Sequence, residues 1–294
     1  ASLFIPFFRV YPIEQALTTG TIWESTIAWI NINFFDAIDA VKTFLLTWLL
    51  LPVKQFFGGI PWPVGIVVTG LAAGRAGGWR LGLLAAAMMT FIAATGLWNK
   101  AMITIYLTSV AVLLASVIGI PLGIWAGQNA RANSVIGAII DTLQTLPSFV
   151  YLIPVIMLFR VGDFSALIAI VLYALAPAVR YAAHGIRSID PELIEAGKVA
   201  GCTNWQLLRR IKLPLAAPSL LLGLNQTIML ALSMLVITAL VGTRDLGQEV
   251  YIALTKANVG KGIVAGLGVA FLAIIADRVV NALARQSRER LGLE

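Results

Sequence analysis

The chain of 294 residues is 59% hydrophobic and only 12% charged, and its mean hydropathy is +0.90. A water-soluble domain of this length could not cover its surface with so few charged side chains. The net charge of +7 does not indicate a nucleic-acid-binding surface, because the basic residues lie in short runs between long apolar segments. Helices are the expected spanning elements, since the alternation of barrel strands is absent. We therefore predict an all-α integral membrane protein.

Residues 1–60 differ from the rest because charged side chains alternate there with tryptophan and phenylalanine. Such a mixture is typical of amphipathic helices that lie on a membrane surface. The apolar stretch 43–53 is too short to span a bilayer comfortably. We predict an amphipathic interfacial segment over 1–60, with a true span at 43–53 as the alternative.

Seven apolar runs follow, each close to the roughly 20 residues that a helix needs to cross a bilayer. They are 55–74, 81–99, 101–130, 134–159, 164–179, 213–243 and 262–283. The sequence thus predicts about seven transmembrane helices. We expect two peripheral helices within 61–99, a transmembrane core over 100–284 and a basic cytoplasmic tail over 285–294.

The distribution of lysine and arginine predicts the orientation, because cytoplasmic loops carry an excess of both. With the N-terminus outside, the inner connections hold Arg75, Arg80, Arg131, Arg180, Arg187, Lys198, Arg209, Arg210 and Lys212. The outer connections hold only Lys100, Arg160, Arg244, Lys256 and Lys261. We therefore predict an external N-terminus and a cytoplasmic C-terminus.

The segment 188–214 is the longest predicted cytoplasmic connection and the richest in charge. Asp190, Pro191 and Glu192 form a helix start, with an N-cap, a proline in the first position and an acidic first turn. A short helix is expected to break near Gly201, and Thr203 or the next residue can cap a second one. Two short helices beneath the membrane would form a compact knob suited to docking in a groove of another protein.

The same segment resembles the EAA signature of ABC importer permeases. Glu195-Ala196 is followed by Gly201, then by nine residues before Ile211, and then by Leu213-Pro214, with the spacing of that signature. One departure is Gly197, where the family's second alanine is usual. The resemblance implies that this loop couples the chain to an ATPase. The coupling candidates are Glu195, Ala196, Gly197, Gly201, Cys202, Trp205, Ile211 and Pro214.

The resemblance extends over 60–277, where the chain is similar to the permease of glycine betaine/proline betaine importers. The stretches that carry it are 120–125, 149–152, 224–227, 230–234 and 245–248. It implies a MetI-like type I importer in a bacterial inner membrane, with a homodimer of permeases, two cytoplasmic ATPases and an external substrate-binding protein. Glycine betaine, proline betaine, choline and trimethylamine N-oxide all remain open as cargo, for osmoprotection or for nutrient uptake.

Polar residues in the run 134–159 are candidates for the solute pathway. On a single helix they would share one stripe. The stripe consists of Asp141, Gln144, Ser148 and Tyr151. Because polar groups in a membrane need partners or water, the stripe lines the path or holds helices together. Pro147 and Pro154 would kink this helix, which could serve a gate.

Weaker candidates lie in the run 213–243, where Gln226 and Ser233 share a face and Asn225 is adjacent; path and packing are equally open for them. Small residues recur every four positions in two other runs, which predicts close helix packing. These runs are 115, 119, 123, 127 and 262, 266, 270. We interpret Asp277 and Arg278 as a local ion pair.

Other functions fit the sequence less well. An ion-coupled carrier usually has buried acidic residues or repeated broken helices, and it is the less favoured alternative. A permease for another small polar solute, such as an amino acid, is the nearer alternative. With His184 as its one histidine and no HExxH or GxSxG motif, the chain is expected to hold neither a metal site nor a catalytic site. It lacks a P-loop, so ATP and Mg are expected to bind to the partner ATPase.

Overall fold

The computed structural model describes residues 20–292, and this part of the chain is helical apart from short connections. The first elements are α1 (Gly20–Asn33), α2 (Phe35–Leu45), η3 (Leu46–Leu50), α3 (Leu51–Gly58), α4 (Trp62–Gly77) and α5 (Trp79–Ala94). The middle elements are α6 (Trp98–Gln128), α7 (Ala130–Thr145), α8 (Ser148–Phe159) and α9 (Asp163–Arg187). The last are α10 (Pro191–Val199), α11 (Asn204–Leu207), η4 (Leu208–Lys212), α12 (Leu213–Thr238), η5 (Ala239–Val241), α13 (Leu246–Thr255) and α14 (Val259–Leu291). The predicted all-α class is confirmed for the described residues.

Four of the described helices are long and apolar enough to cross a membrane: α6, α9, the continuous helix 204–241 and α14. Two further candidates are pairs of helices bent at a break, so the described residues hold up to 6 spans rather than the predicted seven. The chain breaks at 59–61, where Pro61 precedes α4. Both α4 and α5 contain 16 residues, which makes each only about 24 Å long against a hydrocarbon core of about 30 Å.

The predicted single helix over 134–159 is wrong, because the chain turns by 98° between α7 and α8. Leu146 has an extended backbone, with ψ at 133°, and Pro147 follows it. Proline disfavours helical backbone in the residue before it and offers no N–H to continue the ladder. The four polar candidates of this run therefore do not form one stripe, since two lie on α7 and two on α8.

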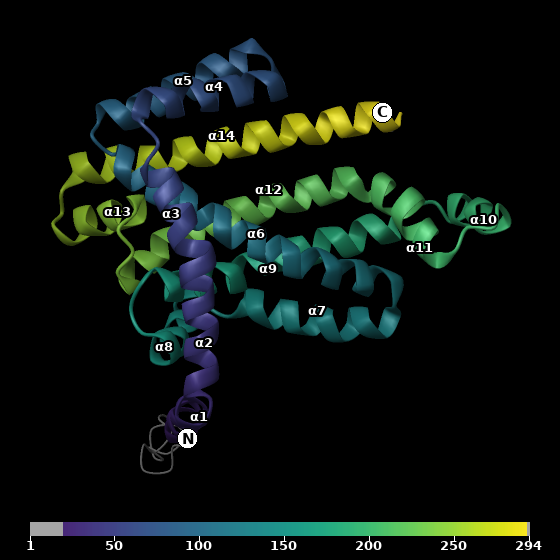
Figure 1. Cartoon of the computed structure of the whole chain (residues 1–294), viewed down its shortest axis with the longest axis horizontal. Coiled ribbons are helices and arrows are strands. Elements are labelled where there is room, and N and C mark those ends of the chain that lie inside the picture. The colour runs from purple at the N-terminus through teal and green to yellow at the C-terminus, as the bar shows by residue number, and fades with distance from the viewer. Residues whose placement is uncertain (1–19, 293–294) are drawn as a thin grey trace, which may run out of the picture.

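Long helices run side by side through the molecule, and α6 packs most closely on α9 (Figure 1). Added Cβ atoms at Gly119 and Gly127 would lie 2.7 Å from Ala178 Cβ and 2.8 Å from Ile186 Cβ, so only glycine permits this approach. The predicted packing stripe at 115–127 is confirmed. The stripe at 262–270 packs only in part within the described chain: a Cβ at Gly262 would lie 3.5 Å from Ala253 Cβ, whereas one at Gly266 would meet nothing within 4 Å.

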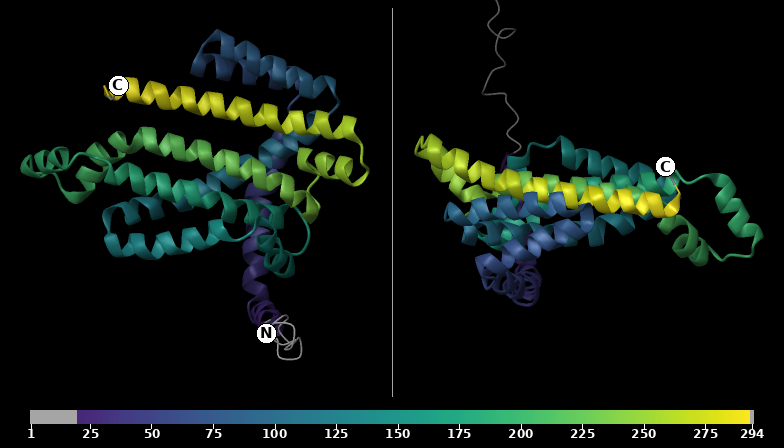
Figure 2. Two further views of the ribbon diagram at one scale, coloured as in Figure 1. Left: turned by 180° about the vertical axis from the view of Figure 1, so that it is seen from behind. Right: turned by 90° about the horizontal axis from the view of Figure 1, so that it is seen from above.

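The two ends of the bundle differ in shape. Helices α10 and α11 project beyond the other elements at one end, where α14 also ends, and α13 lies at the opposite end (Figures 1 and 2). We call these the loop end and the α13 end. The predicted basic tail over 285–294 begins inside α14, which continues through Leu291.

An N-terminal arm, residues 20–58, crosses the long helices nearer the α13 end (Figure 1). Its axis over 35–58 meets that of α4 at 102°. Trp23 and Trp48 of the arm are 67% and 74% exposed, whereas Leu50 is buried against the core beside Leu107 of α6. The part of the interfacial prediction that falls on residues 1–19 lies outside the described residues.

Candidate functional site

The projecting loop 188–214 begins with a capped helix, as the sequence predicts. Asp190 Oδ1 accepts a hydrogen bond of 2.9 Å from the Glu192 N–H, and Pro191 occupies the first position of α10. The helix ends where Gly201 takes a φ of +79° and the Cys202 N–H donates to the Gly197 carbonyl at 3.1 Å. A side chain at 201 would be strained, because residues with a Cβ rarely adopt this conformation.

A second cap starts the helix that returns to the membrane. The Thr203 hydroxyl accepts from the Gln206 N–H at 3.3 Å, and Gln206 Oε1 accepts from the Thr203 N–H at 2.9 Å. This reciprocal pair is a capping box. From Asn204 the helix continues through η4 into α12 as one membrane span that reaches Val241. The returning part of the loop and this span are therefore one continuous helix.

Gly197 fixes how α10 lies on the returning helix. A Cβ at this position would lie 2.6 Å from Ile211 Cδ1 and 2.7 Å from Leu207 Cδ1. Gly197 is also the buried residue of α10. The glycine that departs from the family's usual alanine thus permits a close contact, which the sequence pattern alone did not indicate.

The outer surface of the loop is exposed and partly apolar. Trp205 is 66% exposed and Val199 is 90% exposed. The predicted coupling residues divide by burial: Glu195, Ala196, Gly201, Trp205 and Pro214 are exposed, Cys202 and Ile211 are half-buried, and Gly197 is buried. The loop therefore joins a fixed base to a free surface that carries a carboxylate beside large apolar groups.

The exposed polar pathway candidates are Asp141, Gln226 and Ser233. Asp141 of α7 accepts a hydrogen bond of 2.5 Å from Arg180 of α9, and both side chains are more than half exposed. On α12, Leu224 and Ile228 pack in the core with α6, whereas Gln226 lies on the opposite side of the helix. We call the exposed set Asp141, Arg180, Gln226 and Ser233 the polar face.

The remaining pathway candidates are less accessible. Tyr151 is buried on α8, and its ring lies edge-on to Tyr173 of α9 with centroids 6.3 Å apart. The Tyr151 hydroxyl has no hydrogen-bond partner among residues 20–292. Gln144 and Ser148 are half-buried on either side of the break at Pro147. Pro154 lies inside α8, which ends five residues later.

Asn225 joins two helices rather than facing a path. Its side chain is buried, and Nδ2 donates to Asp277 Oδ1 of α14 at 2.8 Å. The same carboxylate oxygen accepts from Asn281 at 2.8 Å. The interpretation of Asp277 and Arg278 as a local pair is wrong for this reason: in the described chain the carboxylate serves as a polar link between α12 and α14.

A polar cluster at the α13 end escaped sequence reasoning. Lys54 of the arm lies 2.7 Å from Asp163 at the start of α9, and the Tyr106 hydroxyl of α6 donates to the same carboxylate. Asp245 is fully buried and caps α13 by accepting from the Gln248 N–H at 3.0 Å. The 245–248 motif was a signal for the cap, but no local pattern links positions 54, 106 and 163.

Burial sets the ionisation of Asp245, which lies in the connection before α13. Desolvation raises the pKa of this carboxyl from 3.8 to about 6, although the hydrogen bond from the Gln248 N–H acts to lower it. The negative charge of Asp163 adds to the increase.

Spanning helices, a broken helix and a projecting loop continuous with a span define an inner-membrane transport permease. A family model described as "Binding-protein-dependent transport system inner membrane component" matches residues 119–289. The chain belongs to this family.

Curated relatives cover nearly the whole chain. The chain is 36% identical over 286 residues to the glycine betaine/proline betaine transport system permease protein ProW of Escherichia coli (strain K12), covering 97% of this chain and 79% of that protein. It is 34% identical to the glycine betaine transport system permease protein OpuAB of Bacillus subtilis (strain 168), covering 92% of this chain and 95% of the relative. It is 37% identical to the trimethylamine N-oxide transport system permease protein TmoV of Pelagibacter ubique (strain HTCC1062), covering 96% of this chain but only 40% of that protein.

Among solved structures, an inward-facing conformation of the MetNI methionine ABC transporter matches with a TM-score of 0.60. The match covers 68% of this chain and 98% of that chain at 21% identity. This likeness shows the fold alone. It confirms the predicted MetI-like fold, and the family confirms a multi-pass inner-membrane component.

Proposed function

We propose that this chain is the permease subunit of an ATP-binding-cassette importer for a small quaternary or methylated amine. The observation that carries the proposal is the capped loop 188–214, which projects from the bundle and continues without a break into a membrane span. The chain itself takes part in no hydrolysis in this proposal. ATP and Mg are bound by a partner ATPase that docks on the loop.

The cargo is inferred from the relatives, whose names give glycine betaine, proline betaine and trimethylamine N-oxide as substrates. All three carry methylated nitrogen, so the shared chemistry is a small, strongly hydrated methylated amine. An external binding protein delivers the cargo in this proposal. A permease for another small polar solute, such as an amino acid, is the second candidate, because MetNI shares the fold.

Two permeases are proposed to pair through the polar face. Gln226 and Ser233 are exposed on α12, a helix that is otherwise well packed, and the exposed Asp141–Arg180 pair joins α7 to α9, which packs on α12. Charged and amide groups at bilayer depth need a wet cavity or a protein partner. Pairing through this face would enclose them along a path between two copies, with the break at Pro147 close to that path.

The loop end is proposed to be cytoplasmic, with the N-terminus outside. Alternating access follows: closure of the ATPases moves the two loops, and each loop moves its α12. The contact between the loop and the ATPase must differ in strength between the two conformations of the transporter in alternating access. Only a ligand that binds one conformation more tightly shifts the equilibrium between them.

The proposal is tested by ATP-dependent uptake in vesicles that contain the whole transporter. Glu195→Gln and Gly201→Val are expected to lower uptake of glycine betaine by more than about tenfold, because each alters the docking surface or its bend. Arg131→Gln, in the first turn of α7 and outside the loop 188–214, is the control and should transport normally. Normal uptake by both loop variants would contradict the coupling role, and uptake of methionine but not of any methylated amine would favour the second candidate.

A further inference from the structure

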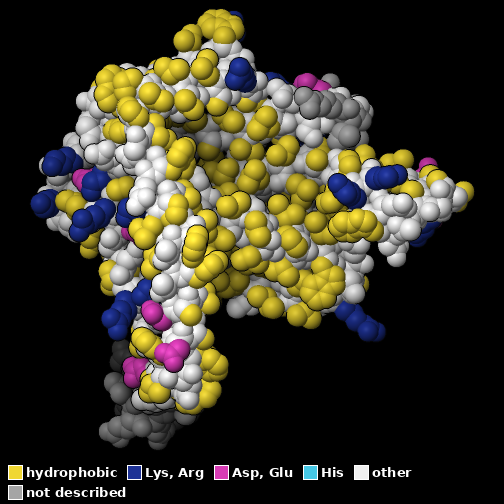
Figure 3. All heavy atoms as spheres, viewed as in Figure 1, with side chains coloured by type: hydrophobic (Ala, Val, Ile, Leu, Met, Phe, Trp, Pro, Cys, Tyr) yellow, Lys and Arg dark blue, Asp and Glu magenta, His cyan; other side chains and the backbone are white. Residues whose placement is uncertain are grey.

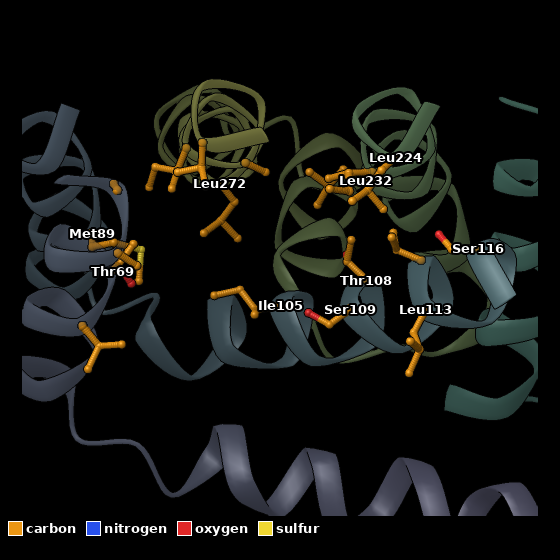
Figure 4. A pocket seen from close by; sticks show the side chains of 18 residues that line it. Thr69, Met89, Ile105, Thr108, Ser109, Leu113, Ser116, Leu224, Leu232 and Leu272 are labelled. Carbon is orange, nitrogen blue, oxygen red and sulfur yellow. The ribbon is translucent and has the colours of Figure 1, made fainter. Parts of the chain in front are cut away.

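Two hollows of the described chain differ in chemistry. The larger, of about 660 Å³, lies between the α4–α5 pair and the long helices, and Leu224 and Leu272 are among the apolar side chains that border it (Figure 4). No charged residue lines it, so its wall carries no group that would select one ligand over another. The smaller, of about 140 Å³, lies between the arm and the end of α8 and is lined by charges of both signs.

We call the smaller hollow the arm pocket. The arm supplies its N-terminal wall through the end of α1 and through α2, and both helices contact α8. The residues on which its chemistry depends are Asn31, Phe35, Asp39 and Lys42 of the arm, with Met157 and Arg160 from the end of α8.

The arm pocket lies at the depth of lipid headgroups. The axis of the arm over 35–58 meets that of α4 at 102°, so the arm runs close to the membrane plane when α4 runs along the membrane normal. Helix α9 has 25 residues, so it is about 38 Å long and extends beyond a hydrocarbon core of about 30 Å. Arg160 lies three residues before α9 begins at Asp163, which places it in the polar interface.

Three charges line the arm pocket without neutralising one another. Asp39, Lys42 and Arg160 form no ion pair with any residue in the part of the chain that the structure describes. Asp39 and Arg160 are exposed and Lys42 is half-buried, so each retains surface that a ligand can reach. Figure 3 shows acidic, basic and hydrophobic side chains close together on and beside the arm. A ligand with one negative and one positive group would pair with all three charges at once.

The backbone of Arg160 indicates that its side chain has a role in this place. Its φ of 66° and ψ of 178° define a conformation that glycine adopts almost exclusively. The Arg160 N–H donates to the Ile156 carbonyl at 2.8 Å, and the Arg160 carbonyl accepts from the Ser165 hydroxyl, so the neighbouring turns hold this conformation. Glycine would fit the backbone without strain. The backbone therefore does not explain an arginine, whereas a bound anion would.

The rim of the arm pocket separates two kinds of ligand. Phe35 and Met157 line the pocket and are both exposed. A small water-soluble zwitterion would gain little from such a rim. An amphiphile would place its charged group in the pocket and rest its apolar part against the rim, where burial is favourable. The combination of charged interior, apolar rim and interfacial depth fits a membrane lipid.

We propose that the arm pocket binds the headgroup of a phosphatidylethanolamine molecule. Lys42 and Arg160 pair with the phosphate, and the guanidinium of Arg160 can donate two parallel hydrogen bonds to it. The Asp39 carboxylate accepts from the ammonium, which is a donor of three hydrogen bonds. The headgroup thus joins the arm to the end of α8, the second half of the broken helix. This assignment does not depend on the cargo of the transporter.

The test measures lipids bound to the whole purified transporter in detergent by native mass spectrometry. Dioleoyl phosphatidylethanolamine and dioleoyl phosphatidylglycerol are titrated separately. The ethanolamine lipid is expected to bind about tenfold more tightly, because only its ammonium pairs with Asp39. Asp39→Asn should abolish this preference. Asp36→Asn, on the same helix but outside the pocket, is the matched control and should retain it.

Arg160→Gly separates binding from folding. The variant removes the guanidinium and relieves the strained backbone, so the affinity for the ethanolamine lipid should fall about tenfold. The thermal midpoint of the lipid-free transporter should not fall, because glycine adopts a φ of 66° readily. Lys256→Gln, at an exposed position just after α13, also removes a positive charge and should leave lipid binding unchanged.

Three outcomes would overturn the assignment. The first is equal affinity of the unaltered transporter for the two lipids. The second is an affinity for the ethanolamine lipid that neither Asp39→Asn nor Arg160→Gly lowers. The third is binding of free phosphoethanolamine or glycine betaine as tight as that of the lipid, lost in the same two variants, which would assign the arm pocket to a water-soluble zwitterion.

Discussion

The two ends of the bundle satisfy their polar groups in opposite ways. At the loop end, the side chains of Asp190 and Thr203 bond to backbone N–H groups only two or three residues away. At the α13 end, Lys54, Tyr106 and Asp163 come from three distant parts of the sequence and meet at one carboxylate. The first arrangement can move as a unit without breaking its hydrogen bonds. The second holds the arm, α6 and α9 in one fixed geometry.

This difference matches the role proposed for the loop end. A loop that transmits closure of an ATPase must keep its internal structure while it changes position. The α13 end has no such part in the proposed coupling, and its long-range contacts hold three elements together. Substitutions at the loop end should therefore impair transport more than stability, and substitutions at the α13 end should do the reverse.

The largest effect is expected from Gly197→Val at the loop end. The new side chain would come too close to the Cδ1 atoms of Ile211 and Leu207, so these side-chain ends or α10 itself must shift. Uptake of methylated amine should fall by more than about tenfold, while the thermal midpoint of the purified permease changes little, because the loop packs on η4 rather than in the bundle. Gly137→Val is the control, since a Cβ there meets nothing within 4 Å. A large fall in the thermal midpoint with normal uptake would contradict the expectation that the loop end affects transport more than stability.

The next effect concerns Asp245→Asn at the α13 end. The folded-state pKa of about 6 lies above the ordinary 3.8, so the folded chain binds more protons than the unfolded chain between these values. The stability linked to this proton is present below 3.8 and is lost as the pH rises through about 6. At neutral pH the buried ionised carboxylate costs about 3 kcal/mol, for a shift of about two pKa units.

Asparagine keeps the oxygen that caps α13 and cannot ionise. The variant should therefore have a higher thermal midpoint than the unaltered protein at about pH 7.5, with the advantage shrinking towards about pH 5. Thermal unfolding in detergent across this range checks the prediction. A constant difference at all pH values would show that the ionisation of Asp245 is not its cause.

The contrast between the ends also explains how far the sequence could be interpreted. The loop was largely predictable, with a break near Gly201 and a second cap at Thr203 or the next residue, because its hydrogen bonds are local. The cluster around Asp163 was not, since no local pattern indicates that residue 54 returns to residue 163. The bend at Pro147 was foreseen as a kink, but its 98° depends on tertiary packing. Hydropathy alone overestimated the length of α4 and α5, which contain 16 residues each.

A smaller effect is expected from Tyr106→Phe at the α13 end. The hydroxyl donates to Asp163, and its loss leaves the carboxylate with Lys54 as its remaining partner. Stability should fall by about 1–2 kcal/mol, as for a hydrogen bond to a charged group. Equilibrium unfolding in mixed micelles measures this change, and uptake should remain near normal. Tyr251→Phe, at an exposed position on α13, should leave stability unchanged. If Tyr106→Phe abolished uptake without lowering stability, the α13 end would act in transport, contrary to the stabilising role that we expect for it.

The smallest effect is expected from Thr203→Ala, which removes one half of the capping box at the loop end. A lost N-cap costs about 1 kcal/mol, and here the cost falls on the first turn of α11 rather than on the bundle. Hydrogen exchange at the Gln206 amide should therefore accelerate about fivefold, while exchange within α12 stays unchanged. Thr90→Ala, whose hydroxyl bonds only within α5, should alter neither. Because the loop and α12 form one continuous helix, faster exchange that extended deep into α12 would mean that the loop does not move as a unit. The coupling would then have to be carried by unfolding at the membrane surface.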